Sequence, residues 1–180
     1  MKFLDVKTYP DPCLRVATRP VECFDDDLKA LLRSMGDVMY LNNGIGLAGT
    51  QVGLSLSVLV VDIGSGLMNF VNPEIIEKSG KKSAMLEGCL SLPGIEVNVK
   101  RPEEVQIRAQ NENGGIFVKK FDGLAAKALQ HEIDHLQGKL LIDYLDPVRR
   151  FMAIRKLSRS KRNNDKKTCE VVCNVGKRDN

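Results

Sequence analysis

This sequence is organised around residues 130–135, which are Gln130-His131-Glu132-Ile133-Asp134-His135. They lie in a segment whose apolar residues recur three and four positions apart, the spacing that is typical of a helix with one buried face. We predict a helix that begins at Asp122 and ends at Gly138, because glycine favours the position just beyond a helix end. On such a helix His131 and His135 lie one turn apart on the same face, with their Cβ atoms about 6 Å from each other.

Two imidazoles in this arrangement can occupy neighbouring corners of a tetrahedral metal site. Glu132 lies about 100° round the helix from His131, too far to be a natural third ligand but near enough to contact a water molecule on the metal. That is the position of a general base. The alternative is a surface helix with two solvated histidines. This alternative has to supply partners for both rings, because the chain contains only these two histidines and an unpartnered imidazole pair on such an apolar helix would be costly to desolvate.

A third metal ligand is available in Glu87-Gly88-Cys89-Leu90-Ser91, a short segment with one cysteine beside a glycine. The thiolate of Cys89 would complete a site of two histidines and one cysteine with one open position. The alternative for Cys89 is an ordinary buried cysteine. Cys169 and Cys173 are rival ligands, but they lie in a polar tail where a site would be poorly preorganised.

The rest of the chain predicts two more helices and several short strands. Asp25-Asp26-Asp27 is suited to cap a helix over residues 26–41, and Pro147 is suited to begin a final helix that ends near residue 160. The run Gly44 to Gln51 is so rich in glycine that we expect a loop whose backbone another group approaches closely. Apolar runs predict strands at residues 57–63, 70–73, 74–78, 95–99, 104–109 and 115–121. The expected fold class is α+β, with short, mostly antiparallel strands around a central metal-binding helix, an N-terminal helix and a C-terminal basic helix.

Length and composition predict one globular domain in a reducing compartment. The chain has 180 residues, of which 43% are hydrophobic and 28% charged, and its apolar runs fall far short of the about 20 residues that a membrane span needs. The first residues become charged too soon for a secretory signal, and the 5 cysteines follow no disulfide framework. We therefore expect a cytoplasmic protein with no membrane partner. Its expected parts are a catalytic domain over 1–147, a basic helix of the same domain over 148–162, and a disordered tail over 163–180.

Three segments of the chain, taken together, resemble the peptide deformylase family. Their order and separations also match, and the likeness extends over roughly residues 1–160. The departures are Gly49, where the family usually has alanine, and Lys127, where the family tends to place an apolar residue that lines a methionine pocket. The aliphatic stem of Lys127 could still line that wall while its ammonium reaches water. The three segments are Gly44 to Gln51, Glu87 to Ser91 and Gln130 to Gly138.

This resemblance implies a metal-dependent hydrolase that removes the formyl group from the N-terminal formylmethionine of new polypeptides and releases formate. It implies one divalent metal ion, Fe²⁺ as the usual metal with Zn, Ni or Co as substitutes, held by Cys89, His131 and His135. Glu132 would accept the proton of the attacking water and deliver it to the departing amine. The side-chain amide of Gln51 and the backbone N–H of Leu90 would stabilise the oxyanion.

The resemblance also implies a binding site for the formylated nascent peptide. Gly44 and Gly46 would allow the peptide to lie close to the backbone as an added strand. Arg101 or Arg108 would meet the peptide carboxylate. The remaining substrate-binding candidates, four of them apolar walls for the methionine side chain and the fifth a glycine beside Cys89, are Ile45, Leu86, Leu124, Ala128 and Gly88.

Two other functions stay open at this point, and the tail adds a second partner. A zinc peptidase shares the His-Glu-x-x-His pattern, although it usually takes a downstream His, Glu or Asp as third ligand. A non-enzymatic, metal-stabilised RNA-binding module would use the basic tail instead. Residues 149–180 carry 11 Lys and Arg against 3 Asp and Glu, whereas residues 1–148 carry 16 against 20. Basic residues alternate with apolar ones up to Arg162, so we expect an amphipathic helix that contacts ribosomal RNA.

Overall fold

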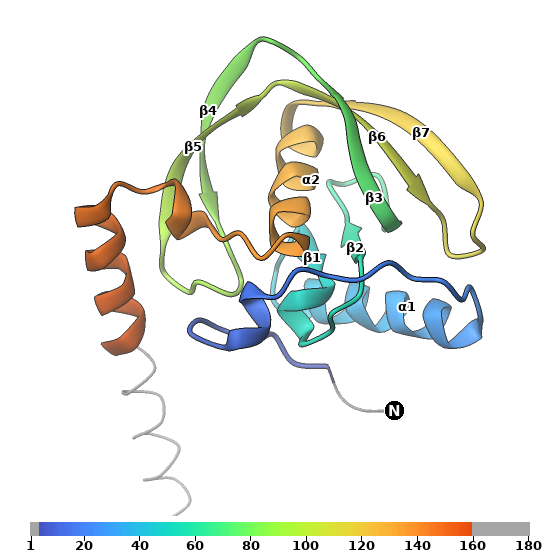
Figure 1. The fold of residues 1–180 in the computed structure, drawn as a ribbon, viewed down its shortest axis with the longest axis horizontal. Coiled ribbons are helices and arrows are strands. Elements are labelled where there is room, and N and C mark those ends of the chain that lie inside the picture. The colour runs from blue at the N-terminus through green and yellow to red at the C-terminus, as the bar shows by residue number, and fades with distance from the viewer. Residues whose placement is uncertain (1–3, 160–180) are drawn as a thin grey trace, which may run out of the picture.

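The computed structural model describes residues 4–159. Its architecture consists of two main helices, two antiparallel sheets and a C-terminal helix over residues 147–159 (Figure 1). Three short 3-10 helices join these elements. The helices and strands that carry labels are α1 (Asp26–Leu41), β1 (Gly46–Ala48), β2 (Val58–Val61), β3 (Met68–Lys78), β4 (Lys82–Gly88), β5 (Glu96–Pro102), β6 (Glu104–Gln110), β7 (Ile116–Asp122) and α2 (Gly123–Leu136), and the 3-10 helices are η1 (Pro12–Arg15), η2 (Gly49–Val52) and η3 (Leu141–Tyr144).

The larger sheet has five strands in the order β1-β2-β3-β6-β7, and the smaller one is the hairpin β4-β5. Every strand pair is antiparallel. Helix α2 stands between the two sheets and contacts strands of both (Figure 1). This arrangement confirms the predicted α+β class with a central helix that carries the two histidines.

The burial of α2 explains why this helix forms where it does. It begins at the residue after Asp122 and has Gly138, with a φ of 72°, just beyond its end. Leu129, Ile133 and their apolar neighbours pack against Phe70 and Ile107 of the larger sheet. A helix that is buried on nearly all sides gains most of its stability from packing and little from propensity. The polar side chains that it carries are therefore held inside the protein.

Two parts of the fold differ from the sequence-based prediction. The run from Gly44 to Gln51 is only partly a loop, because Gly46–Ala48 pairs with β2 and η2 follows directly. Residues 68–78 form one strand, β3, where we expected two. The strand continues past Pro73 through irregular pairing with β6, and Asn72 has a φ of 51° there. A bulge of this kind accommodates a residue that cannot donate to the ladder.

Strand β4 was not predicted at all. Its residues alternate between exposed and half-buried positions, and Glu87 is its one buried side chain. A strand without an apolar face gives no periodic signal in the sequence. Its place in the fold is set by pairing with β5 along its whole length.

The C-terminal helix packs on the body through Ala153 and Leu157, which belong to the same buried cluster as Leu92 and Leu140. The division of the chain at residues 147 and 162 stays a prediction. The expected tail over 163–180, the end of the basic helix at Lys161 and Arg162, and the rival ligands Cys169 and Cys173 lie outside the described residues. Within residues 4–159, none of the helices has the length and apolar character that crossing a membrane requires.

Candidate metal centre and catalytic pocket

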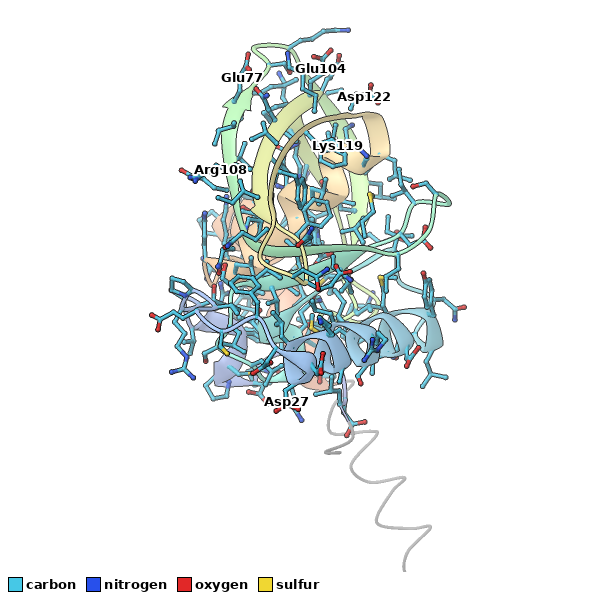
Figure 2. All side chains as sticks on the ribbon, turned by 90° about the vertical axis from the view of Figure 1, so that its right-hand side faces the viewer. Asp27, Glu77, Glu104, Arg108, Lys119 and Asp122 are labelled. Carbon is cyan, nitrogen blue, oxygen red and sulfur yellow. The ribbon has the colours of Figure 1, made fainter. Side chains whose placement is uncertain are left out.

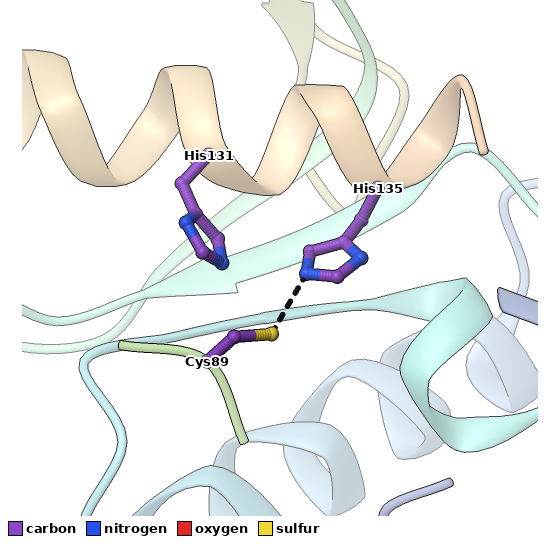
Figure 3. A group of neighbouring side chains, drawn as sticks. All are labelled: Cys89, His131 and His135. Carbon is purple, nitrogen blue, oxygen red and sulfur yellow. Dashed lines mark hydrogen bonds between the residues drawn. The ribbon is translucent and has the colours of Figure 1, made fainter. Parts of the chain in front are cut away.

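The structure brings the three predicted metal ligands together from two elements. His131 and His135 come from α2, and Cys89 follows the last residue of β4 (Figure 3). One potential ligand atom from each residue lies within 4.8 Å of the other two. The Sγ atom of Cys89 is 3.1 Å from Nε2 of His135, and the ring centroids of the two histidines are 5.0 Å apart. The cluster is a group that could hold one metal ion.

The chemistry of this cluster fits a divalent metal. Two imidazoles and a thiolate form a three-ligand set that leaves one position of a tetrahedral site for water or substrate. Protein groups already fix the outer nitrogen of one ring, since Nδ1 of His131 is 3.0 Å from Oε2 of Glu87. A carboxylate on the outer nitrogen sets the tautomer of a metal-binding histidine and leaves Nε2 free for the ion. Nδ1 of His135 is buried and has no hydrogen-bond partner among residues 4–159.

The two rings have opposite electrostatic environments. Burial by itself lowers the pKa of His131, but hydrogen bonds with Cys89 and Glu87 and the charge of Glu132 outweigh burial and raise this pKa to about 10. Burial lowers the pKa of His135 well below its ordinary value, and the positive charge of His131 lowers it further. Negative groups are thus concentrated around His131. A metal cation would occupy the same favourable potential that raises the pKa of this ring.

Glu132 lies at the same site in a setting suited to proton transfer. Glu132 is 4% exposed, and its Oε2 is buried with no hydrogen-bond partner in the part of the chain that the structure describes. Burial raises its pKa to about 7, so that it exchanges a proton near neutral pH. Gly46 of β1 leaves room for this carboxylate, because a Cβ atom at position 46 would lie 2.5 Å from Oε1 of Glu132. The close approach that we predicted for the glycine-rich run is therefore made by a side chain of the protein itself.

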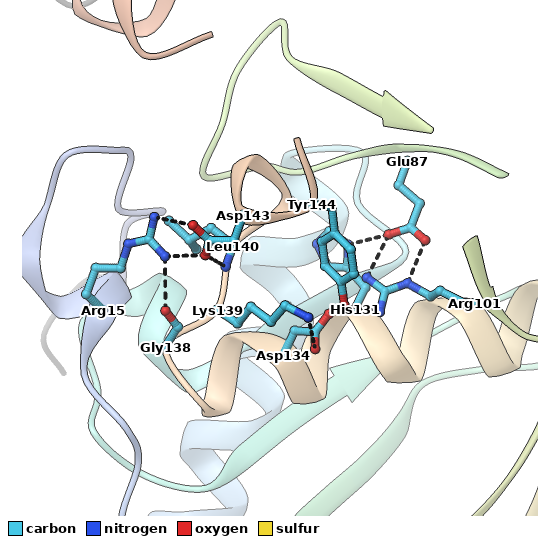
Figure 4. Close-up of polar contacts among 10 residues, drawn as sticks. All are labelled: Arg15, Glu87, Arg101, His131, Asp134, Gly138, Lys139, Leu140, Asp143 and Tyr144. Carbon is cyan, nitrogen blue, oxygen red and sulfur yellow. Dashed lines mark hydrogen bonds and ion pairs between the residues drawn. The ribbon is translucent and has the colours of Figure 1, made fainter. Parts of the chain in front are cut away.

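A buried polar network supports His131 from behind. Arg101 donates through Nε and Nη2 to the two oxygens of Glu87, at 2.7 and 3.0 Å, and through Nη1 to Asp134 at 2.8 Å (Figure 4). The hydroxyl of Tyr144 also donates to Asp134, at 2.6 Å. Burial raises the pKa of Glu87, but its hydrogen bonds with His131 and Arg101 outweigh burial and hold the pKa below its usual value. Burial lowers the pKa of Arg101, but its two carboxylate partners, Glu87 and Asp134, outweigh burial and raise this pKa above its usual value.

This network corrects one prediction and adds residues that sequence reasoning missed. Arg101 is 4% exposed and paired, so it is not free to bind a peptide carboxylate. Arg108 lies on the larger sheet (Figure 2) and is not part of the pocket lining. The role of Glu87 was missed, although its place two residues before Cys89 was a usable signal. Asp134, the residue before His135, pairs with Arg101.

Gln51 reaches the site from the 3-10 helix η2. Its Oε1 atom accepts from the backbone N–H of Ala48 at 2.8 Å. This bond orients the amide so that Nε2 lies 3.6 Å from Sγ of Cys89 and 3.3 Å from Oγ of Ser91. The donor end of Gln51 therefore points toward the ligand cluster. Gly49, next to Ala48, has no room for a Cβ atom, which would lie 2.7 Å from the carbonyl oxygen of Leu56.

A pocket of about 650 Å³, called the main pocket below, opens over these groups. It is bounded by residues of β1, the end of β4 and the outer half of α2. Apart from Arg101 and Arg108, every residue that the sequence suggested for catalysis or substrate binding lines it, as do the ligands Cys89 and His131, whereas His135 is not part of the lining. Lys127, whose stem we considered for the methionine wall, is also part of the lining. The lining residues that we had not considered are Asn42, Asn43, Met85, Glu87, Pro93 and Gly94.

Comparison with known proteins agrees with this geometry. A family model described as polypeptide deformylase matches residues 3–151. Peptide deformylase 1 of Burkholderia multivorans is 41% identical over 165 residues, which are 90% of this chain and 91% of that protein. The peptide deformylase of Tolumonas auensis is 43% identical over 166 residues, 91% of this chain and 99% of its own. The crystal structure of a peptide deformylase from Legionella pneumophila superposes with a TM-score of 0.86 at 42% identity, covering 91% of this chain and 98% of that one.

Proposed function

The chain belongs to the polypeptide deformylase family, and from this membership we propose how its own residues carry out the reaction. It is a metal-dependent hydrolase that removes the formyl group from the N-terminal formylmethionine of new polypeptides. The observation that carries our assignment of roles is the meeting of Cys89, His131 and His135 with Glu132 in one pocket.

We propose that Cys89, His131 and His135 hold one divalent metal ion. A metal at this position supplies Lewis acidity toward water and toward the formyl oxygen. We propose Fe²⁺ as the metal in the cell, with Zn, Ni or Co as substitutes, because two histidines and one thiolate suit all four. The support for Fe²⁺ is the resemblance to the family, since this donor set alone selects none of the four.

Glu132 is the proposed general base and then general acid. It takes up the proton of the water that attacks the formyl carbon, and it returns a proton to the amine that leaves as the new N-terminus. Its burial and its pKa of about 7 suit both directions of transfer. The network of Glu87, Arg101 and Asp134 does not touch the substrate. It positions His131, and through His131 the cluster.

Gln51 and Leu90 are the proposed donors to the oxygen of the tetrahedral intermediate. The amide of Gln51 is oriented by its bond to Ala48, so its N–H groups need little reorganisation when charge develops. Leu90 lines the main pocket directly after Cys89. Donors of this kind contribute about 3–4 kcal/mol each to lowering a barrier.

The peptide is proposed to lie between β1 and the end of β4. Gly44 and Gly46 border the main pocket from one side, and Gly88 from the other. Among the described strands, β1 pairs with β2 alone and β4 with β5 alone, so each is an edge strand of its sheet. An extended backbone can therefore add a strand there. The methionine side chain is then received by apolar walls at Ile45, Leu86, Leu124 and Ala128.

Family membership sets aside the two other functions that the sequence left open. The third ligand available to the histidines is the upstream Cys89, and a zinc peptidase usually takes a downstream His, Glu or Asp. A purely RNA-binding module would have no use for Glu132 in the pocket. The deciding experiment is formate release from a formyl-Met peptide by anaerobically purified protein, with metal analysis of the same sample. Cleavage of an unformylated peptide, with the formylated one untouched, would overturn the assignment.

We propose a second partner, ribosomal RNA, for the C-terminal helix, and the cytoplasm as the compartment. Arg155 and Arg159 are exposed on this helix beside the exposed side chains of Phe151 and Met152. Contacts with phosphates release counterions, so the affinity should fall steeply with salt. Sedimentation with ribosomes over a range of salt concentrations tests this partner. A salt-independent affinity, or one that survives deletion of residues 148–180, would contradict it.

A further inference from the structure

Lys127 is a cationic side chain on the wall of the main pocket that no described group pairs with. It belongs to α2, one turn before His131, and it is 8% exposed. Within residues 4–159 its side chain makes no hydrogen bond and no ion pair within 4.0 Å. The ammonium nitrogen is not one of the buried polar atoms that lack a partner among these residues, so the aliphatic stem is buried while the ammonium keeps access to the space of the pocket. A protein that keeps an ammonium group in its binding pocket has a ready donor for a group of the ligand.

The position of Lys127 places it at the inner wall of the pocket. Lys127, Leu124 and Met85 line the main pocket and also a second hollow of about 350 Å³, called the acidic hollow below. These three residues therefore form the partition between the two spaces. Leu124 belongs both to this partition and to the apolar wall proposed for the methionine side chain. A methionine side chain against that wall would therefore extend toward Lys127.

The acidic hollow explains how a lysine is tolerated in the partition. Glu103, Glu104 and Asp122 line it. Glu104 and Asp122 are opposite each other in the register of β6 and β7, and both lie at the end of the larger sheet far from α1 (Figure 2). Glu103 is already paired with Lys81 at 2.9 Å. The negative charge of these three carboxylates favours a cation in the partition electrostatically. None of the three is within ion-pair distance of the Lys127 ammonium, so its N–H groups stay available.

We propose that Lys127 is a specificity-determining residue that lets this enzyme accept formyl peptides whose first residue is methionine sulfoxide. This inference rests on the proposed function of the pocket. Oxidation converts the flexible, apolar methionine side chain into a polar and chiral one with a strong acceptor oxygen. A purely apolar pocket binds a sulfoxide poorly, because the sulfoxide oxygen would lose its hydrogen bonds with water without gaining one from the protein. The ammonium of Lys127 supplies the missing donor at the end of the side chain where the sulfoxide oxygen is.

The size of the effect follows from the kind of hydrogen bond. Hydrogen bonds to charged groups contribute more than neutral ones, and removal of the charged donor lowers the relevant rate constant by roughly tenfold or more. The bond should also depend on which sulfoxide epimer is presented, since the oxygen of only one epimer faces a donor held by the helix. For unoxidised methionine the lysine contributes packing through its aliphatic stem, and replacement by methionine preserves that packing.

The test is kcat/KM for four formyl peptides that differ only in the first residue, namely methionine, each of its two separated sulfoxide epimers, and norleucine. We expect Lys127→Met to lower the ratio of the better sulfoxide epimer to methionine by about tenfold or more. We expect Lys127→Arg to retain most of that ratio, because it keeps a cationic donor. Lys120→Met removes a positive charge from the exposed face of β7 and should leave the ratio as it is.

The possible results separate the proposed role of Lys127 from the proposed deformylase function. A sulfoxide to methionine ratio that is the same in the wild type and in Lys127→Met overturns the inference while leaving the deformylase assignment intact. Equal loss of the ratio in Lys120→Met also overturns it, because the effect would then be one of net charge. Absence of formate from the formyl-Met peptide itself contradicts the proposed function. The norleucine peptide shows whether Lys127→Met changes the fit of an apolar side chain, and a loss for norleucine as large as that for the sulfoxide contradicts a donor role.

Discussion

Helix α2, which carries the two histidines, and the basic C-terminal helix differ in how much of their surface is buried. On α2, nearly every residue from Ala125 to Leu136 is buried. On the C-terminal helix over 147–159, Ala153 and Leu157 are buried, whereas Val148, Phe151 and Met152 are 68, 60 and 57% exposed. The polar groups of α2 are therefore held inside the protein, and His131 and Asp134 among them have polar partners there. Those of the C-terminal helix face solvent.

This difference separates two kinds of function. The buried groups of α2 are fixed by packing and by the Glu87 network, and such preorganisation is what chemistry at a metal requires. The C-terminal helix keeps apolar and basic groups uncovered, which suits association with another surface. The C-terminal helix contacts the lining of the main pocket at Lys156, whose ammonium donates to the carbonyl of Gly94 at 2.7 Å. Changes on α2 should affect turnover, and changes on the other helix should not.

The largest effect is expected for Glu132→Gln on α2. The variant keeps the size of the side chain but removes the base, so we expect kcat to fall by about 10²-fold to 10⁴-fold while the metal content stays at the wild-type level. Formate release and metal analysis on the same sample measure both quantities. Turnover near the wild-type value would show that the proton is transferred by another group.

The next effect is expected at Gly46, where α2 touches β1. A Cβ atom in Gly46→Ala would lie 2.5 Å from Oε1 of Glu132, so the carboxylate must shift, and a displacement of about 1 Å at a catalytic group can cost about 10²-fold in rate. Gly80→Ala is the matched control, because a Cβ atom there has no neighbour within 4 Å. If both variants keep the wild-type kcat, the close approach of Glu132 to β1 has no part in catalysis.

A smaller effect is expected when the support of His131 is weakened. Glu87→Gln keeps the shape of the side chain but loses the charge that holds Nδ1 of His131 and pairs with Arg101. Changes to such supporting carboxylates lower metal affinity by about 10-fold to 100-fold. Competition with a chelator measures this affinity independently of turnover. An unchanged affinity would mean that packing of α2 alone orients the ring.

The smallest effect is expected at Asp143, which joins the C-terminal helix to the body. Its carboxylate bonds with Arg15, accepts from the N–H of Leu140 at 2.8 Å, and pairs with Arg150 of the C-terminal helix at 3.0 Å. Asp143→Asn should lower the free energy of unfolding by about 1 kcal/mol at pH 7, because partly exposed pairs and caps contribute about that much. Turnover of a formyl peptide should not change.

The pH dependence of this effect has a definite sign. Burial raises the pKa of Asp143, but the bond from Arg15, the N–H of Leu140 and the charges of both arginines outweigh it and hold the pKa below its ordinary value. A carboxyl group with a lowered folded-state pKa stabilises the fold above its unfolded pKa, and this contribution is lost as the pH falls through the folded pKa. Urea unfolding at several pH values should show the difference between wild type and Asp143→Asn narrowing below about pH 4. A constant difference would contradict a charge-based role.

The comparison also shows what could be predicted from the sequence. Helix α2 and the meeting of His131 with His135 were predictable, because a helix places residues i and i+4 on one face whatever surrounds it. Cys89 could be suggested as the third ligand but not placed, since its distance to the histidines depends on how β4 and α2 pack. The partners Glu87 and Arg101 are 14 residues apart and lie on the paired strands β4 and β5, where they are not opposite each other in the register. No local pattern marks that contact.

Cys89 is the ligand that joins the β4 segment to the two histidines of α2 at the proposed metal centre, and the absorption spectrum of the cobalt-loaded protein tests this role. A thiolate bound to cobalt gives a sulfur-to-metal charge-transfer band, which histidine and carboxylate ligands do not give. We predict this band in the wild type with one cobalt per chain, its loss in Cys89→Ser, and its persistence when Cys169 and Cys173 are both replaced by serine. A band that survives Cys89→Ser, or that disappears with the two C-terminal cysteines, would contradict the proposed metal centre.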